Sequence, residues 1–131
     1  MIVVDASAVV EFLLGTPAGV PVRDRIADPA VGIAVPSLLD VEVAQAVRRF
    51  FLAGLISDVR ATKSIEHLAD LNATRWPHQP LLPRIWALRH NFTAYDAAYI
   101  ALAESLGATL LTCDAALTGI ANINCDVELI E

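Results

Sequence analysis

The chain has 131 residues, enough for a hydrophobic core of its own, and we expect residues 1–131 to form a single domain. Its hydrophobic content of 56% and mean hydropathy of +0.55 are high, yet no apolar run approaches the roughly 20 residues that span a membrane. The net charge of −6 argues against a protein that coats nucleic acid, and two cysteines are too few for a disulfide framework or a structural zinc site.

The first half of the chain alternates short apolar strands with helices. The N-terminus has no basic region and carries Asp5 early, so we expect no signal peptide and a cytoplasmic location. The pattern predicts a strand over 2–4, a helix over 7–14 with Ser7 as its N-cap, a short helix over 20–28, a strand over 31–35, and a long helix from Ser37 to Gly54.

The second half continues the alternation. A helix capped by Ser57 is predicted to run to about Ala73, and residues 75–80 are irregular or a brief strand. The remaining predictions are a helix over 81–90, a helix from Thr93 to its C-cap Gly107, a strand over 108–112, a short helix over 114–121 and a last strand over 127–130.

These elements predict the fold class. The strands show no polar alternation, which indicates a sheet buried on both faces and therefore mostly parallel. We expect an α/β protein, a three-layer α/β/α sandwich with a mostly parallel central sheet. Ligands bind such sheets at the carboxyl ends of the strands, which is where Asp5 and Asp114 fall.

Three aspartates of interest each have a structural alternative. Asp5 suits a carboxylate that accepts backbone N–H groups in a turn, and Asp114 stands where a helix N-cap belongs. Asp96 follows Thr93 by three residues, the spacing of a capping box. Taken singly, each aspartate is explained by its turn.

Glu42 is harder to explain by local structure. Ser37 and Asp40 already have the spacing of a capping box, and Glu42 lies among apolar residues. Asp40 and Glu42 differ by about 200° around a helix, so only one of them faces a shared site. The apolar neighbours favour Glu42.

Together the four acids indicate a metal site. Clustered carboxylates repel one another and raise each other's pKa unless a cation lies between them. Carboxylate oxygens without His or Cys suit Mg²⁺ or Mn²⁺. The three histidines lie outside these stretches, and we expect them at the surface. Eight of the nine basic residues are arginine, a side chain that suits phosphate contacts but is more common on solvated helix faces.

The order and spacing of these motifs resemble the PIN-domain ribonucleases, most closely the VapC toxins of toxin–antitoxin pairs. The stretches that carry the resemblance are VVDASAVVEFLL, PSLLDVEVAQAV and FTAYDAAYIALAESLGATLLTCDAAL, and it covers nearly the full chain. It implies an acidic catalytic and metal-binding site of Asp5, Glu42, Asp96 and Asp114, supported by the hydroxyls of Ser7 and Thr112.

The resemblance also implies an activity and partners. The activity is metal-dependent cleavage of transfer or ribosomal RNA by an activated water, leaving a 3′-hydroxyl and a 5′-phosphate, with the effect of stopping translation and growth. The partners are an inhibitory antitoxin of the VapB type and a second copy in a homodimer. We expect an antitoxin segment to insert a basic residue among the acids and to contact Val10, Leu13 and Leu14. Ala115 and Ala116 stand where many relatives have a further Asp or Asn, which leaves one ion or two open.

Other classes fit the motifs less well. A phosphatase with an Asp nucleophile needs a second Asp two residues after Asp5, where this chain has Ser7. A receiver-type signalling domain needs a lysine after a late strand, and the single lysine, Lys63, lies in a predicted helix. A PIN nuclease of RNA processing and a non-catalytic binding module on the same fold remain as alternatives.

Overall fold

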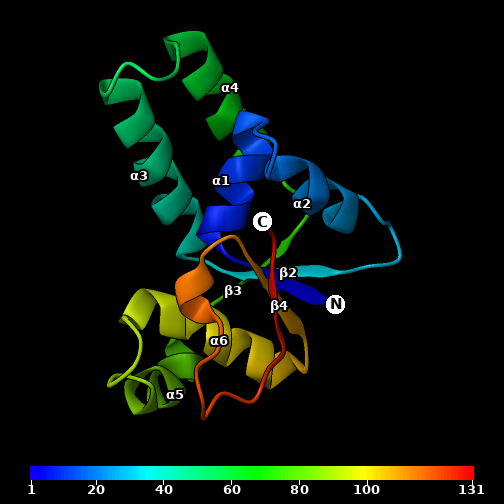
Figure 1. The fold of residues 1–131 in the computed structure, drawn as a ribbon, viewed down its shortest axis with the longest axis vertical. Helices are drawn as coiled ribbons and strands as arrows, with labels where there is room; N and C mark the ends of the chain where they lie inside the picture. The colour runs from blue at the N-terminus through cyan, green and yellow to red at the C-terminus, as the bar shows by residue number, and fades with distance from the viewer.

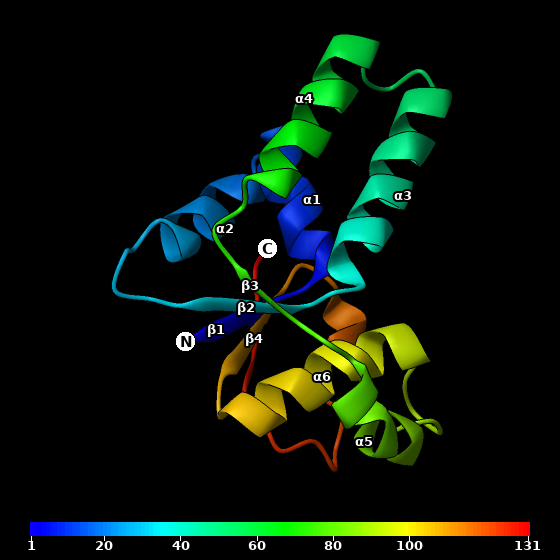
Figure 2. The same cartoon turned by 180° about the vertical axis from the view of Figure 1, so that it is seen from behind.

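The computed structural model describes all 131 residues, whose strands and helices alternate along most of the chain (Figures 1 and 2). The strands are β1 (Ile2–Val4), β2 (Ile33–Pro36), β3 (Thr74–Trp76), β4 (Thr109–Thr112) and β5 (Val127–Leu129). The α-helices are α1 (Ala6–Leu14), α2 (Gly19–Ile26), α3 (Leu39–Leu52), α4 (Asp58–Ala69), α5 (Leu82–Ala87) and α6 (Ala94–Leu106). Two short 3₁₀ helices, η1 (Gln79–Leu81) and η2 (Ala115–Leu117), complete the secondary structure.

The five strands form one sheet in the order β3-β2-β1-β4-β5, and all four neighbouring pairs are parallel. Helices α1 to α4 lie on one side of this sheet, while α5 and α6 lie on the other (Figure 1). The predicted three-layer α/β/α class with a parallel sheet is therefore confirmed.

The strand order places a crevice at the carboxyl end of β1. The chain leaves β1 through α1 and α2 and returns as β2 on one side, whereas β4 pairs with the other side of β1. In open parallel sheets this change of direction separates the loops beyond the strands and leaves room for a ligand. The ends of β1 and β4 therefore mark the expected position of a site.

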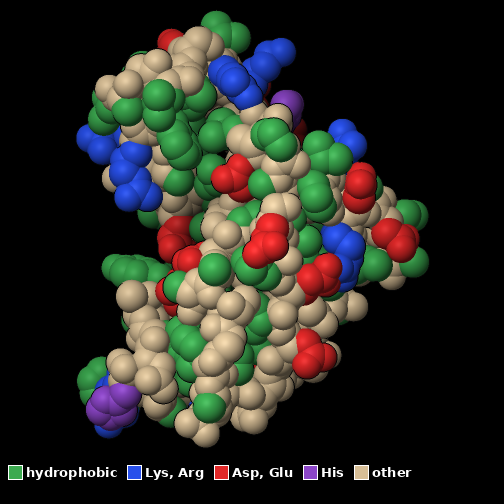
Figure 3. Space-filling model, in the orientation of Figure 1, with side chains coloured by type: hydrophobic (Ala, Val, Ile, Leu, Met, Phe, Trp, Pro, Cys, Tyr) green, Lys and Arg blue, Asp and Glu red, His purple; other side chains and the backbone are tan.

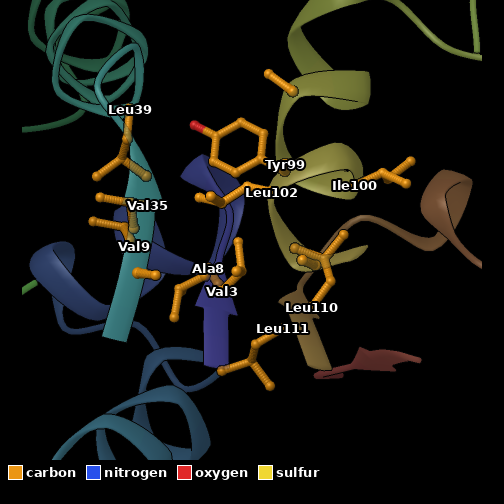
Figure 4. Close-up of a cluster of buried hydrophobic side chains, with 14 of the residues drawn as sticks. Val3, Ala8, Val9, Val35, Leu39, Tyr99, Ile100, Leu102, Leu110 and Leu111 are labelled. Atoms are coloured by element: carbon orange, nitrogen blue, oxygen red, sulfur yellow. The ribbon is translucent and has the colours of Figure 1, made fainter. Parts of the chain in front are cut away.

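A cluster of 30 buried apolar residues fixes these strand ends in space. Val3 of β1 and Leu110 and Leu111 of β4 are fully buried between Ala8 of α1 and Leu102 of α6, as Figure 4 shows. Burying one such Val or Leu side chain contributes about 1.5–3 kcal/mol. The site is thus built on two buried inner strands of the sheet.

Several local predictions were wrong. The predicted helix over 114–121 is only the three-residue 3₁₀ helix η2, and the predicted helix over 81–90 ends at Ala87. The first helix is capped by Asp5, not Ser7, because the Asp5 carboxylate accepts the N–H of Ala8. The α3 helix has no side-chain cap; Ser37 Oγ instead donates to the Trp76 carbonyl at 3.1 Å.

The α4 helix ends at Ala69, four residues before the predicted Ala73. The reason is Arg75 of β3, whose guanidinium donates to the carbonyl of Leu68 at 2.8 Å and to that of Leu71 at 3.3 Å. These bonds satisfy carbonyls at the end of the helix, so the chain turns into β3. No helix of the structure has both the length and the apolar character needed to cross a membrane.

Candidate functional site

A cavity of about 680 Å³ lies where the carboxyl ends of β1 and β4 meet α1, α3 and α6. Its lining includes all four acids singled out in the sequence: Asp5, Glu42, Asp96 and Asp114. Figure 3 shows Asp and Glu side chains in the hollow between the α3–α4 part of the molecule and the α6 part. Residues far apart in the chain thus share one site.

Asp5 is the most firmly held of the four, with 5% of its surface exposed. One carboxylate oxygen accepts Ser7 Oγ at 2.6 Å and the Ala8 N–H at 3.1 Å, and the other accepts the hydroxyl of Thr112. Burial raises the pKa of Asp5, the hydrogen bonds lower it in part, and the negative charge of Asp114 raises it further. Asp5 is therefore a carboxylate that is fixed in position and largely shielded from water.

Two hydroxyls join Asp5 to the turn that follows β4. Ser7 Oγ also accepts the N–H of Cys113 at 3.0 Å, and Thr112 Oγ1 accepts the N–H of Asp114 at 3.0 Å. Asp114 itself is exposed and accepts the N–H of Ala116 at 2.9 Å, so it caps η2 as its structural alternative predicts. Ser7 and Thr112 therefore set the relative positions of Asp5 and Asp114.

The α3 helix presents Glu42, not Asp40, to the cavity. The carboxylate of Glu42 accepts the hydroxyl of Tyr99 at 2.7 Å. Burial raises the pKa of Glu42, the Tyr99 hydrogen bond opposes this rise, and the charges of Asp96 and Asp5 add to it. Asp40 binds Arg75 instead, through two hydrogen bonds of 2.7 and 3.0 Å.

Asp96 lies in the first turn of α6, half-buried at the cavity wall. Its backbone N–H donates to Thr93 Oγ1 at 3.1 Å, the N-cap bond that the spacing predicted. Burial raises the pKa of Asp96, and the charges of Asp114 and Asp5 raise it further. The Thr93 cap orients this turn so that the Asp96 side chain faces the other acids.

None of the four acids forms an ion pair with a basic side chain. As the side chains stand, no three of them, and no other three His, Cys, Asp or Glu residues, are gathered closely enough to hold an ion. The donor set fits Mg²⁺ or Mn²⁺ in chemistry, because it consists of carboxylate oxygens alone.

Three polar residues that the sequence did not single out also line the cavity: Tyr99, Glu11 and Arg49. Tyr99 lies three positions after Asp96 on α6, and Arg49 lies seven positions after Glu42 on α3. Each spacing places the residue on the same helix face as the acid, so Tyr99 and Arg49 were predictable from the sequence. Glu11 accepts the hydroxyl of Thr16, a contact across the end of α1 that no spacing rule indicates.

Comparison with known proteins assigns the chain to a family. A family model described as PIN domain matches residues 2–123 of the chain. The chain belongs to the PIN-domain family. The resemblance drawn from the sequence is therefore confirmed, and PIN nucleases as a family hydrolyse phosphodiester bonds.

The relatives within this family are VapC ribonucleases. Ribonuclease VapC12 of Mycobacterium tuberculosis is 42% identical over 130 residues, with 99% of each chain covered, and Ribonuclease VapC1 of the same organism is 41% identical, with 98% of this chain and 96% of VapC1 covered. The crystal structure of M. tuberculosis VapC20, described as a Sarcin-Ricin loop cleaving toxin, superposes with a TM-score of 0.67 at 14% identity, covering 95% of this chain and all of the other. The chain is thus a VapC-type PIN protein in sequence and in fold.

Proposed function

We propose that the protein is a metal-dependent endoribonuclease toxin of a type II toxin–antitoxin pair, which cleaves transfer or ribosomal RNA inside the cell. The observation that carries the proposal is the group of four acids that line one cavity without a basic partner. The VapC ribonucleases similar to it over their full length add independent support.

PIN nucleases are generally metal-dependent, and we assign Asp5, Asp96 and Asp114 to hold the ion. A bound Mg²⁺ or Mn²⁺ supplies an activated water and neutralises charge on the phosphoryl oxygens. Asp5 contributes a carboxylate whose direction is fixed by Ser7 and Thr112, whereas the more exposed Asp114 adjusts to the substrate.

Glu42 is assigned a separate role, to bind the ion or to orient the water and accept its proton. A raised pKa makes a carboxylate a better proton acceptor near neutrality, and burial together with the neighbouring acids raises the pKa of Glu42. Tyr99 donates its hydroxyl to Glu42 and so fixes the carboxylate from behind. No side chain of the cavity is required as a covalent nucleophile.

A VapB-type antitoxin is the proposed protein partner. The cavity offers acids for an inserted arginine and apolar walls from Ala46, Phe50 and Leu55 for the surrounding peptide. Of the three apolar contacts expected from the sequence, only Val10 lines this cavity. Leu13 lines a second groove with Phe12 and Ile26 and so remains a proposed contact on the surface of the first two helices, whereas Leu14 and Val10 are only 6% and 8% exposed and offer little surface.

A homodimer belongs to the same proposal. Large apolar side chains are exposed around α5 and the start of α6, with Trp86 68%, Tyr95 64% and Leu82 50% exposed. Exposed groups of this kind are typical of a protein interface. Light scattering of the purified protein tests this, with the mass of two chains as the expected result.

The decisive experiment for the activity is RNA cleavage by the purified protein with Mg²⁺ or Mn²⁺, followed by mapping of the cut sites on total RNA. We expect cleavage that stops in excess EDTA. Full activity in EDTA would rule out the metal mechanism.

A second experiment tests the toxin role. Expression of the protein alone should arrest growth, and co-expression of the small gene beside it should restore growth. If the protein cleaves RNA but is harmless and binds no neighbouring product, a PIN nuclease of RNA processing is the better description. If it neither cleaves RNA nor binds metal, it is a binding module on the same fold.

A further inference from the structure

The arginines of the chain divide into two groups. Six of the eight have a partner within the chain: Arg23 (Asp24), Arg25 (Glu128), Arg60 (the Leu14 carbonyl), Arg75 (Asp40), Arg84 (Glu104) and Arg89 (the Trp86 ring and carbonyl). Arg48 and Arg49 on α3 have neither an ion pair nor a side-chain hydrogen bond to any residue. These neighbours are the two arginines that the fold itself does not use.

Arg49 differs from Arg48 in its position relative to the site. Arg49 lines the acidic cavity, and it is the single basic residue among the 14 that do. It lies seven positions after Glu42 on the same face of α3, about 10 Å further along the helix axis. Arg48 points about 100° away around the helix and does not line the cavity. Figure 3 shows basic side chains over α3 beside the hollow that holds the acids.

We infer that Arg49 binds a phosphate of the RNA strand next to the phosphate that is cleaved, and so sets the register of the substrate in the cavity. This inference rests on the proposed function. With a cation at the four acids, a strand laid along α3 presents one phosphate there and the next towards Arg49. The planar guanidinium of arginine matches the oxygens of a phosphate in a bidentate contact.

An RNA strand accounts for Arg49 beside the acids more simply than a peptide does. A protein segment would need a basic group at the acids and an acidic group at Arg49, in a fixed order. In RNA the same group, the phosphate, meets both ends, one through the ion and the other through Arg49. Phe50 beside Arg49 adds an aromatic face of the kind on which unpaired bases stack.

The test compares Arg49→Ala with Arg48→Ala as the matched control. The substrate is a short single-stranded RNA that spans a cut site mapped on total RNA, and kcat and KM are measured over a range of salt concentrations. We expect Arg49→Ala to raise KM about tenfold with kcat nearly unchanged, the pattern of a contact made equally in the ground and transition states. The dependence of log(kcat/KM) on log[salt] should become shallower by about 0.7, the loss of one phosphate contact on a single strand. Arg48→Ala should change neither quantity. Arg49→Lys should have a KM between those of the wild type and Arg49→Ala.

A substrate with one neutral methylphosphonate linkage identifies the phosphate. Neutralising the contacted phosphate should raise the KM of the wild type. It should leave the KM of Arg49→Ala, which is already raised, unchanged. The inference fails if the wild type cleaves this RNA and Arg49→Ala behaves like Arg48→Ala. It also fails if Arg49→Ala weakens binding of the antitoxin and leaves KM for RNA unchanged. If the wild type cleaves no RNA at all, the proposed function fails as well, so the two failures are distinguishable.

Discussion

The two ends of helix α6 each carry a carboxylate, and only one of the two is paired with a basic side chain. Near its C-terminus, Glu104 is 10% exposed in its side chain and accepts two hydrogen bonds from Arg84, at 2.9 and 3.1 Å, as well as the Asn124 N–H at 3.0 Å. In its first turn, Asp96 faces other acids and has no basic partner. A buried acid that serves the fold is neutralised, so the acids left unpaired at the other end indicate a function that needs their charge.

The charge cluster around Glu104 also shows what a structural role looks like. Arg84 donates to the carbonyl of Asn122 at 2.9 Å, so the pair ties α5, α6 and the segment before β5 together. Each group of this cluster has its hydrogen-bond partners within the chain. The site has no basic partner for its acids, and hydroxyls, backbone N–H groups and the N-termini of α1, α3 and α6, where a negative charge is favourable, are what stabilise them.

The largest expected effect comes from removing one unpaired charge. Asp114→Asn should lower the rate of RNA cleavage by more than about 100-fold. This exceeds the loss of about 10- to 100-fold expected for a residue that only positions a metal ligand. The side-chain oxygen that accepts the Ala116 N–H is kept and one repelling charge is removed, so the melting temperature should not fall. Initial rates in Mg²⁺ and a thermal melt measure both. Near-normal cleavage would mean that Asp114 only caps η2.

Next in size is the loss of the hydrogen bond that holds Glu42. Tyr99→Phe should reduce cleavage by about 10- to 100-fold, as expected for a residue that positions a catalytic group. It should cost only about 1 kcal/mol in unfolding free energy, because the ring stays in the core shown in Figure 4. The matched control is Tyr95→Phe, which removes an exposed hydroxyl from the same helix and should change neither quantity. Equal activity of the two variants would show that Tyr99 serves packing alone.

At the other end of α6 the effect should be on stability and not on the reaction. Glu104→Ala leaves Arg84 and the Asn124 N–H without their acceptor and should lower the unfolding free energy by about 1–3 kcal/mol. Asp40→Asn weakens a pair whose acid is 39% exposed, so about 1 kcal/mol or less is expected. Denaturant unfolding measures both, and the activity per folded molecule should stay normal. A loss of activity in Asp40→Asn would mean that Asp40 belongs to the site and that the choice of Glu42 on α3 is wrong.

The smallest expected effect is on the pH dependence of stability. The pKa values of Asp5, Glu42 and Asp96 are raised in the folded protein, chiefly by burial. Above the ordinary carboxyl range, from about pH 4, the folded state therefore binds more protons than the unfolded state, and the free energy of unfolding falls as the pH rises towards neutrality. Without metal, the protein should melt higher at about pH 5 than at pH 7. Saturating Mg²⁺ should abolish or reverse this slope, because the ion binds the ionised acids.

The fold followed closely from the sequence because its signals are local. Apolar runs such as residues 2–4 and 108–112 indicated buried parallel strands, and the end of β1 placed Asp5 at the edge of the sheet. The choice of Glu42 over Asp40 followed from helix geometry, which allows only one of them to face the site, and from the apolar neighbours of Glu42. The expected capping box at Ser37 was wrong because Arg75, which arrives from a later strand, binds Asp40.

What the sequence did not reveal depends on contacts between distant segments. The end of α4 is set by Arg75, and the cap of α1 by a carboxylate that also bonds Thr112 from 107 positions away. The hydroxyl of Tyr99 meets Glu42 across 57 positions. No periodicity contains such information. Which arginines have a partner within the fold, and hence that Arg49 has none, also emerges only in three dimensions.

The central claim is that the four acids are kept unpaired, at a cost in stability, to bind a cation. The most direct test is the melting temperature of the wild type and of Asp96→Asn across a titration with Mg²⁺. Without metal, Asp96→Asn should melt at or above the wild-type temperature, since it removes one repelling charge. Mg²⁺ at about 100 times its dissociation constant should then stabilise the wild type by about 2.7 kcal/mol and leave Asp96→Asn nearly unchanged. A metal-free Asp96→Asn that melts well below the wild type, together with a wild type that does not respond to Mg²⁺, would contradict the account.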